Sequence, residues 1–347
     1  MPDMNAAFIH GIKDMRLGTM PKPEAKEDEL LLRVRSVGVC GSDLHYYLEK
    51  GIGSAQIKEP LVLGHEFSAE VVDERAEQFG FRRGQLVAVD PAKFCYKCEW
   101  CERGHHNLCP NVEFTGAPPF HGAMREYISV SPKQIFPVPD GFSPDDAVML
   151  EPLGIALHAL DLAKLKPMAS VAVLGCGTIG LLILQVAKLC GAGTIYAVDP
   201  LEYRLVAAKN LGADYVATSY QEVLKQTDGR GVDVVLEATN SPIGPRHATE
   251  TVAIGGEVIL VGIPEGDEFS LTASLVRRKG LTIKLSRRMG NVYPRCIQML
   301  HKKLINTKPI VTHHFPLAQT SEAFAVQADY RDGSIKSMIE VGGEITD

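Results

Sequence analysis

No stretch of the sequence approaches the ~18 consecutive apolar residues that a membrane-spanning helix needs. The N-terminal segment, MPDMNAAFIHGIKDMR, also lacks the apolar core of a secretory signal, so the cytoplasm is the expected compartment. Positive charge is not in excess, since 36 Lys and Arg stand against 42 Asp and Glu, a net charge of −6. A protein built around nucleic acid needs a basic face, so this balance argues against such a partner and we expect no membrane partner either.

The 347 residues suffice for about two domains, each large enough to bury a core. Apolar residues at 45% and charged residues at 22% are ordinary for a globular protein and exclude wholesale disorder. The first 150 residues carry short apolar runs separated by Gly and Pro, which is typical of an irregular, mainly β domain. In this part of the chain we expect strands over 30–39, 67–72 and 85–91.

From about residue 155 the pattern changes to strand, glycine turn and amphipathic helix. Near-continuous apolar strands that alternate with helices are what a parallel sheet covered on both faces requires. We expect its strands over 171–177, 194–199, 232–239, 256–262 and 281–286. A helix over 293–301 and a late strand, KSMIEVG, follow. The sequence therefore predicts an α/β chain in which a β-rich domain precedes a doubly wound one.

The segment Gly175-Cys176-Gly177-Thr178-Ile179-Gly180 follows an apolar strand and opens a helix, which is the context that a dinucleotide-binding turn requires. The first glycine allows the tight turn, the second admits a pyrophosphate, and the third lets helix and strand pack closely. Asp199 ends the next strand, where a carboxylate can bind a ribose 2′-hydroxyl, which favours NAD over NADP. Arg204 keeps NADP as an alternative cofactor, because a nearby arginine can accept a 2′-phosphate. The alternative is a plain strand-to-helix turn. The candidate cofactor-binding residues are Gly175, Gly177, Thr178, Ile179, Gly180, Asp199 and Arg204.

Four of the eight cysteines lie close together, with the spacing C-x2-C-x2-C-x7-C: Cys95, Cys98, Cys101 and Cys109. Four thiolates so near can surround one zinc ion and close its shell against water, which makes the role structural. An iron–sulfur cluster is the chemical rival, but its spacing calls for a final interval of three residues. A nucleic-acid-binding zinc ribbon is opposed by Glu99, Glu102 and the net acidity. The chain is too long for a disulfide-stapled mini-domain, so structural zinc is the favoured interpretation.

A second group of possible ligands is spread along the chain: Cys40 in VGVCGSDLHYY, His65 and Glu66 in VLGHEFSAEV, and Glu151 before Pro152. Thiolate, imidazole and carboxylate together suit Zn²⁺, and three protein ligands leave one position open for catalysis. Taken singly, a buried cysteine or histidine is more often core, and a glutamate more often a salt-bridge partner. Their occurrence in one chain favours a catalytic zinc site.

With these motifs in place, the sequence resembles the zinc-dependent medium-chain dehydrogenases and, within them, the sorbitol/xylitol (polyol) dehydrogenases. The resemblance runs from VGVCGSDLHYY through GHE, the cysteine cluster, EPLGIALHA and GCGTIG to PIVTHHFPL. It implies a GroES-like catalytic domain over 1–153, with a structural zinc lobe at 93–111, and a Rossmann domain over 154–287. A C-terminal segment over 288–347 would return to the catalytic domain. It also implies NAD, two zinc ions per subunit and a homo-oligomer, commonly a homotetramer.

The resemblance also implies residue roles. Cys40, His65 and Glu66 would hold the catalytic zinc, and Glu151 would either ligate the ion or hold its water. Ser42 and His45 match the hydroxyl and imidazole through which the substrate proton leaves. The residues that match the lining of the polyol pocket are Tyr46, Phe114 and Arg288.

The expected activity is oxidation of a secondary hydroxyl of a sugar alcohol to a ketose by hydride transfer to NAD. One departure concerns the substrate, since Met289 follows Arg288 where polyol dehydrogenases carry a tyrosine. A phosphorylated polyol, a simple alcohol or threonine are alternatives within the superfamily. A catalytically inactive dinucleotide-binding protein is the alternative from another class, and retention of all four candidate ligands opposes it.

Overall fold

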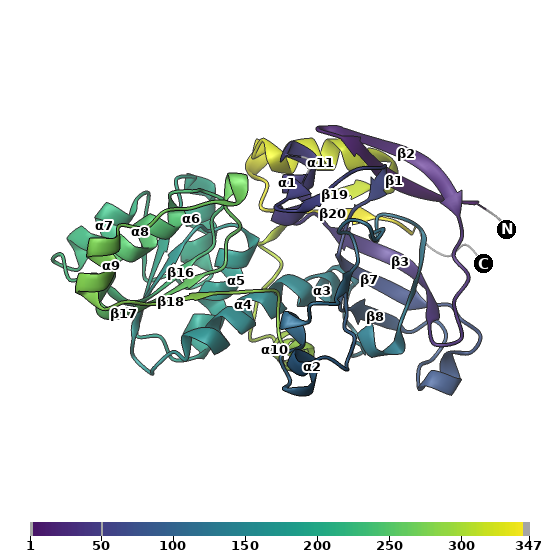
Figure 1. Cartoon of the computed structure of the whole chain (residues 1–347), viewed down its shortest axis with the longest axis horizontal. Coiled ribbons are helices and arrows are strands. Elements are labelled where there is room, and N and C mark those ends of the chain that lie inside the picture. Colours follow the sequence, from purple (N-terminus) through teal and green to yellow (C-terminus); the bar gives the residue numbers. More distant parts are fainter. Residues whose placement is uncertain (1–2, 50, 343–347) are drawn as a thin grey trace. The chain divides into compact units, whose positions relative to one another are not determined.

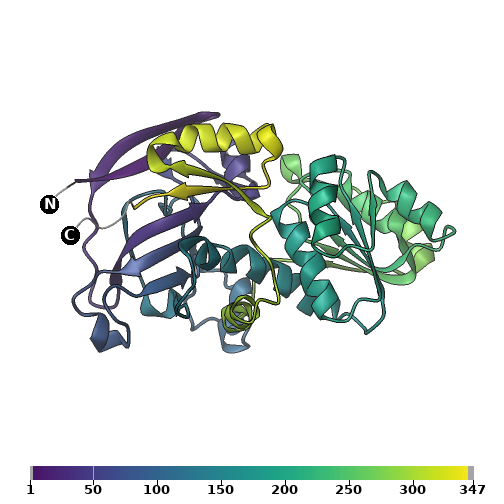
Figure 2. The ribbon, with the colours of Figure 1, turned by 180° about the vertical axis from the view of Figure 1, so that it is seen from behind.

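The computed structural model describes residues 3–49 and 51–342, which divide into two compact units. Unit 1 combines the chain up to Glu151 with Tyr293–His301 and the chain from Val311 onward. Unit 2 consists of Pro152–Val292 and Lys302–Ile310. Figures 1 and 2 show that the C-terminal elements of unit 1, in yellow, lie beside its N-terminal strands, in purple. Among the described residues, no helix has both the length and the apolar character to cross a membrane.

Unit 1 is built on a mixed sheet of seven strands, and the expected strands over 30–39, 67–72 and 85–91 are β3, β7 and β8. Its order is β12 (Ile135–Pro137), β8 (Leu86–Val89), β7 (Glu66–Val71), β3 (Leu30–Gly38), β20 (Lys336–Glu340) and β19 (Val311–Pro316), with β11 (Tyr127–Val130) also pairing with β3. The central strand β3 lies antiparallel to β7 and β20, and Gly38 faces both Glu66 and Met338. The sheet thus joins residues from opposite ends of the chain at the end of β3.

Several further elements complete unit 1. A three-stranded sheet has the order β2 (Asp14–Pro21), β1 (Asp3–Gly11) and β6 (Leu61–Val62). Helix α1 (Gly41–Glu49) begins three residues after β3 ends, and α10 (Tyr293–His301) coincides with the expected helix. The other helices in or entering this unit are α2 (Glu99–Glu102), α3 (Pro144–Val148), α4 (Leu150–Ala163) and α11 (Thr320–Ala328). Phe67 and Phe324, both fully buried, belong to the apolar core that supports them.

Unit 2 contains a parallel sheet of six strands in the order β15 (Tyr215–Ala217), β14 (Thr194–Val198), β13 (Ser170–Leu174), β16 (Val232–Glu237), β17 (Val252–Leu260) and β18 (Thr282–Leu285). Its helices include α5 (Thr178–Leu189), α6 (Glu202–Asn210), α7 (Tyr220–Gln226), α8 (Gly244–Thr251) and α9 (Ala273–Lys279). The chain runs outward from β13 to one edge and then crosses to β16, so the order reverses between these two strands. Ligands of doubly wound sheets bind at that reversal, beyond the carboxyl ends of the strands. The expected α/β fold with a doubly wound parallel sheet is confirmed.

Candidate functional site

Two short segments of unit 1 bring the possible ligands of the open metal site together. Cys40 lies in the loop between β3 and α1, and His65 and Glu66 lie where β7 begins. One ligand atom from each of these three residues lies within 4.8 Å of the other two. His65 and Glu66 are buried, at 6% and 1% exposure. The three residues that the sequence predicts as zinc ligands therefore form one compact donor group.

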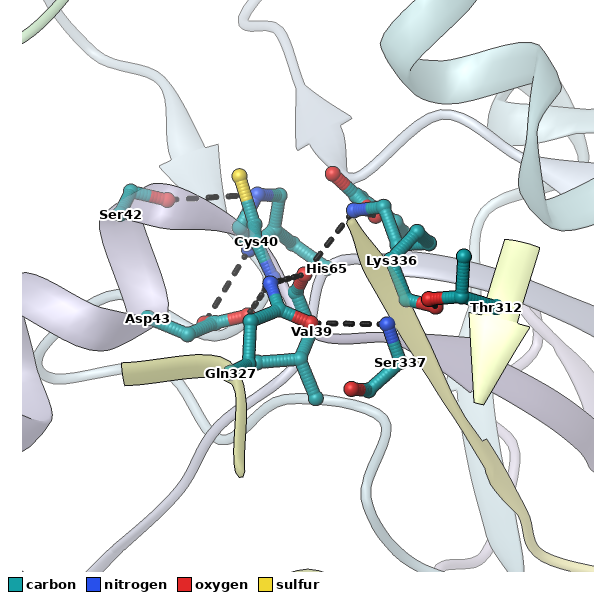
Figure 3. A network of polar contacts seen from close by, with 10 residues as sticks. Val39, Cys40, Ser42, Asp43, His65, Thr312, Gln327, Lys336 and Ser337 are labelled. Atoms are coloured by element: carbon teal, nitrogen blue, oxygen red, sulfur yellow. Dashed lines mark hydrogen bonds and ion pairs between the residues drawn. The ribbon is translucent and has the colours of Figure 1, made fainter. Parts of the chain in front are cut away.

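The orientation of the His65 ring fits metal binding. Its Nδ1 lies 3.4 Å from Oδ1 of Asp43, and its Nε2 lies 3.4 Å from Oγ of Ser42. The other oxygen of Asp43 accepts a hydrogen bond of 3.0 Å from the backbone N–H of Cys40. Metal-ligating histidines commonly donate their second N–H to a carboxylate, which fixes the ring and leaves the other nitrogen for the ion. Figure 3 shows Ser42 and Asp43 beside His65.

Lys336 approaches the same donors from β20. Its ammonium donates to a carboxylate oxygen of Glu66 and, over 2.9 Å, to the backbone carbonyl of Val39. Gln327 donates to the same carbonyl over 2.7 Å and accepts from the backbone N–H of Ser337 over 2.8 Å. Figure 3 shows Lys336 close to Val39, the residue before Cys40. A cation that the sequence did not single out thus anchors both Glu66 and the backbone that carries the thiol.

Gly38 makes room for the Glu66 carboxylate. A Cβ atom placed on Gly38 would overlap the Glu66 oxygen that Lys336 binds, and it would lie 3.1 Å from Val148. The lack of a side chain at Gly38 is therefore a steric condition for the observed position of Glu66.

Burial and the neighbouring charges shift the pKa values of these groups. Burial raises the pKa of the Cys40 thiol, and the nearby Glu66 charge raises it further. Burial also raises the pKa of Glu151 to about 8, although His65 and Lys336 oppose the shift. For His65, burial lowers the pKa, but Asp43 and Cys40 outweigh it and the net pKa lies well above the usual value. A divalent cation would favour the ionised thiol and carboxylates, so the donor set fits zinc.

The remaining residues predicted for the active site take different positions. Glu151 is buried in the first turn of α4 and interacts electrostatically with His65 and Glu66, but it lies outside the tight three-residue group. Phe114 packs its ring 5.4 Å from that of His65. Tyr46 is buried in α1, at 5% exposure. In the same helix, His45 Nδ1 lies 2.8 Å from Oε1 of Glu49.

Arg288 and Met289 belong to unit 2. Arg288 has a left-handed backbone, with φ of +53°. Met289 is buried at 5% exposure, and a Cβ on Gly154 of α4 would overlap its sulfur. The methionine that replaces the expected tyrosine therefore packs directly against the α4 backbone.

The four clustered cysteines form the second compact donor group. The Cys95 and Cys109 sulfurs are 3.5 Å apart, and those of Cys98 and Cys109 are 3.9 Å apart. Tetrahedral ligands at ~2.3 Å from one ion would stand roughly 3.8 Å apart, so the sulfurs fit zinc. The backbone N–H of Lys97 lowers the pKa of Cys95 to about 6, whereas burial raises that of Cys101 to about 12. All eight cysteines are free of disulfides.

The glycine turn in unit 2 has the predicted shape. Gly175 has φ of +90°, and a Cβ there would lie 2.7 Å from the carbonyl of Ala238. A Cβ on Gly180 would overlap the Gly175 carbonyl, so the helix and the turn pack too closely for a side chain. Gly177 caps α5, and the nearest atom to a Cβ there would be a nitrogen of Arg204 at 3.9 Å. Helix α5 begins at Thr178, with Ile179 next, and its N-terminus is therefore accessible to an anion.

Asp199 is 3% exposed at the end of β14. Its carboxylate accepts hydrogen bonds from the backbone N–H groups of Cys176, over 2.8 Å, and Leu201, over 2.9 Å. Arg204 lies 3.6 Å from the same carboxylate. Asp199 thus connects the glycine turn to the next strand. Arg204, the residue that could accept the 2′-phosphate of NADP, is its ion-pair partner.

Comparison with known proteins agrees with this geometry. Residues 26–140 match the alcohol dehydrogenase GroES-like domain, and residues 178–302 match the zinc-binding dehydrogenase family. The chain is 35% identical to a sorbitol dehydrogenase from Bacillus subtilis (strain 168) over 342 residues, 97% of each chain.

Two solved structures are also similar over nearly the whole chain. An oxidoreductase/dehydrogenase of unknown specificity from Escherichia coli has a TM-score of 0.90 and 29% identity, covering 99% of this chain and 100% of that one. A Sinorhizobium meliloti 1021 protein solved with bound NADP has a TM-score of 0.88 and 26% identity, covering 98% and 100%. The chain belongs to the zinc-dependent medium-chain dehydrogenases, in the branch that contains the sorbitol dehydrogenases.

Asp43 and Lys336 are the two site residues that sequence reasoning missed. Asp43 carried a signal, because an acidic residue in the first turn of a helix that follows a candidate ligand can orient a neighbouring group. Lys336 carried a weaker one, a lone lysine in the late apolar strand. Its partner lies 270 positions away in the chain, so only the sheet pairing reveals its role.

Proposed function

We propose that this chain is a zinc- and NAD-dependent polyol dehydrogenase that oxidises a secondary hydroxyl of a sugar alcohol, of xylitol or sorbitol type, to a ketose. The observation that carries the proposal is the compact group of Cys40, His65 and Glu66, whose ligand atoms lie within 4.8 Å of one another. Three such donors leave one position of a tetrahedral ion for substrate. Identity of 35% to a sorbitol dehydrogenase over nearly the full chain supports the polyol class.

In this proposal, Cys40, His65 and Glu66 bind the catalytic zinc, and Glu151 either ligates the ion or holds its water. When bound, zinc would polarise the substrate oxygen and the nicotinamide would accept the hydride. The chain's own residues orient the reactants and move the proton. Asp43 fixes the His65 ring through Nδ1. Glu151 has a raised pKa of about 8 without the ion, so it would give up its proton when the cation binds.

Ser42 and His45 are proposed to carry the proton away from the substrate hydroxyl. Ser42 Oγ lies 3.4 Å from the nitrogen of His65 that faces the donor group, so the hydroxyl stands at the edge of the site. His45 follows one helical turn later in α1 and is buried, at 6% exposure. Imidazole titrates near neutral pH and can accept a proton that passes through the serine hydroxyl. Tyr46, Phe114 and Arg288 are the proposed substrate contacts.

NAD is the proposed cofactor. The glycine turn is open at Gly177 and would receive the pyrophosphate at the N-terminus of α5. Asp199 is the ribose-binding candidate, and its negative charge disfavours a 2′-phosphate. Arg204 pairs with Asp199 instead of standing alone, which supports NAD, although a similar structure holds NADP.

Two zinc ions per subunit are proposed, the second in the four-cysteine group. That group would surround an ion with four sulfurs and leave no open position, which supports a structural role. Thiolates held for metal suit a reducing compartment, which supports the cytoplasm. A homotetramer is the proposed assembly, by similarity to the polyol dehydrogenases.

The deciding experiment measures NAD⁺ reduction by the purified chain with xylitol, sorbitol, galactitol, arabinitol, galactitol 1-phosphate and threonine, with NADP⁺ as the cofactor control. We expect turnover of at least one unphosphorylated polyol and a higher kcat/KM with NAD⁺ than with NADP⁺. Turnover of threonine or the phosphorylated polyol alone would move the chain to another branch. Absence of turnover with two bound zinc ions would contradict the assignment as a polyol dehydrogenase.

A further inference from the structure

Three polar residues of α1 lie along one stripe of the helix. Ser42, His45 and Glu49 follow one another at intervals of three and four residues, which places their side chains on the same face. The stripe begins beside the metal donors, where Ser42 Oγ lies 3.4 Å from His65 Nε2. It ends at Glu49, whose side chain is 34% exposed, whereas the His45 side chain is 7% exposed. The helix therefore connects the buried donor group to water.

The pair at the outer end of this stripe has the geometry of a carboxylate that orients an imidazole. Oε1 of Glu49 lies 2.8 Å from Nδ1 of His45. A carboxylate beside Nδ1 accepts a hydrogen bond from it and so favours the tautomer with hydrogen on Nδ1 and the lone pair on Nε2. In acyl-transfer enzymes the same relationship fixes the tautomer of the base and stabilises the imidazolium that forms.

The position of Glu49 is unfavourable for helix stability. It is the last residue of α1, Gly41–Glu49, and among these described residues the last turn contains no basic side chain. The C-terminal end of a helix carries partial negative charge, so a carboxylate there is repelled while a cation would be favoured. A role in local stability alone therefore does not explain an acidic residue at this place.

Glu49 is an acidic residue in hydrogen-bonding contact with His45, and other charged groups lie on the elements that pack against α1. The helix packs against β4 (Gly51–Ile52), which carries no charge, and against α11. The charged groups of α11 and the residues just beyond it influence Tyr47. Burial raises the Tyr47 pKa most strongly, the charges of Asp329 and Glu322 raise it further, and that of Arg331 lowers it.

We propose that Glu49 is a positioning residue for proton transfer: it holds His45 with hydrogen on Nδ1, directs Nε2 toward Ser42 and stabilises the imidazolium. This inference rests on the proposed function. One proton leaves the substrate hydroxyl and enters Ser42, whose own proton moves to Nε2 of His45. The imidazolium then gives one proton to water at the exposed end of the stripe. Glu49 neither takes up nor gives off a proton in this sequence, so the step releases one proton and no other bond changes.

The test compares the wild-type zinc-loaded protein with Glu49→Gln, which keeps the size of the side chain and removes its charge. Histidines labelled with 15N in the ring report the His45 tautomer by NMR, and the signal missing from His45→Gln assigns the residue. We expect Glu49→Gln to reduce the Nδ1–H tautomer of His45, because the amide that replaces the carboxylate can donate as well as accept a hydrogen bond. We also expect about tenfold lower kcat/KM for polyol oxidation at pH 7, with proton release, followed by a pH indicator, slowed in parallel.

Glu250→Gln is the matched control, because Glu250 also lies in the last turn of a helix, α8, and pairs with a basic side chain, Arg246, four residues earlier. It should leave the His45 signal and kcat/KM unchanged. Since α1 disfavours a terminal acid, Glu49→Gln should melt at or above the wild-type temperature. An unchanged His45 tautomer together with unchanged kcat/KM in Glu49→Gln would overturn the proposal, and a lowered melting temperature with that result would assign Glu49 a structural role. If the wild type oxidises no polyol, the proposed function fails while the NMR comparison still decides the role of Glu49.

Discussion

Lys336 and Glu66 form an ion pair in which both side chains are almost completely buried, at 2% and 1% exposure. Burying two charges costs more desolvation than the attraction reliably returns, so the pair is not explained as a source of net stability. Removal of one partner is nevertheless destabilising, because it leaves the other charge buried without a counter-charge. The pair lies at the zinc donors, and its consequence is therefore tested on the metal-free protein.

Lys336→Met should destabilise the metal-depleted protein by about 3–5 kcal/mol, because Glu66 loses its cation in a buried place. Thermal and urea unfolding after chelation measure the loss. The double variant Lys336→Met/Glu66→Gln should recover most of it, since no unpaired charge remains. Strictly additive losses in the double variant would contradict the role of Lys336 as the partner of Glu66.

Glu151 should make the stability of the metal-free protein depend on pH. Its pKa is raised from 4.5 to about 8, chiefly by burial, so between these values the folded state holds a proton that the unfolded state has lost. Its stabilising contribution is complete below pH 4.5 and disappears as the pH rises through about 8. Stability should therefore fall over this range by a few kcal/mol in the wild type, and the slope should be much smaller in Glu151→Gln. Melting curves from pH 5 to 9 test this, and equal slopes would contradict it.

Substitutions in the two groups of metal donors should have different effects on activity and stability. Cys40→Ser should retain one zinc ion per chain and a near wild-type melting temperature but lose NADH formation with polyols. Cys98→Ser should also retain one ion, at the catalytic site, while its melting temperature falls, because four-cysteine zinc contributes to folding. Metal content by atomic emission and melting curves distinguish these outcomes. Near-full turnover in Cys40→Ser would contradict the catalytic zinc assignment.

Asp199→Asn should narrow the preference for NAD⁺ over NADP⁺ at least tenfold in kcat/KM. Loss of the negative charge removes the repulsion of a 2′-phosphate and frees Arg204, 3.6 Å away, to attract it. The amide oxygen still accepts one of the backbone hydrogen bonds from Cys176 and Leu201, so the turn should stay folded, as circular dichroism will report. An unchanged cofactor ratio would show that Asp199 serves only to brace the turn.

Local sequence patterns were sufficient to predict much of the fold. The predicted strand over 30–39 is β3, Leu30–Gly38, and the predicted helix over 293–301 is α10, Tyr293–His301, because alternation and helical periodicity are properties of neighbouring residues. The glycine turn was equally local. Gly175 and Gly180 leave no room for a side chain, and Gly177 keeps the start of α5 open, as the spacing of the three glycines predicts.

Contacts across the chain were not predictable in the same way. Cys40, His65 and Glu66 were found because their residue types match zinc, whereas Lys336 offers no ligand and its partner is 270 positions away. The ring-orienting role of Asp43 likewise depends on the turn between β3 and α1. Residue chemistry predicted which atoms bind, and tertiary pairing was needed to identify what holds them in place.

The pairing of β20 with β3 also sets an order of assembly during synthesis. Domains fold largely as the chain emerges from the ribosome, from the N-terminus onward. Cys40, His65 and Glu66 are made early, but Lys336 emerges only after all of unit 2 has been synthesised. Until then Glu66 lacks the Lys336 ammonium that it meets in the finished sheet. The polar surroundings of the metal donors can therefore be completed only after the last strand has paired with β3.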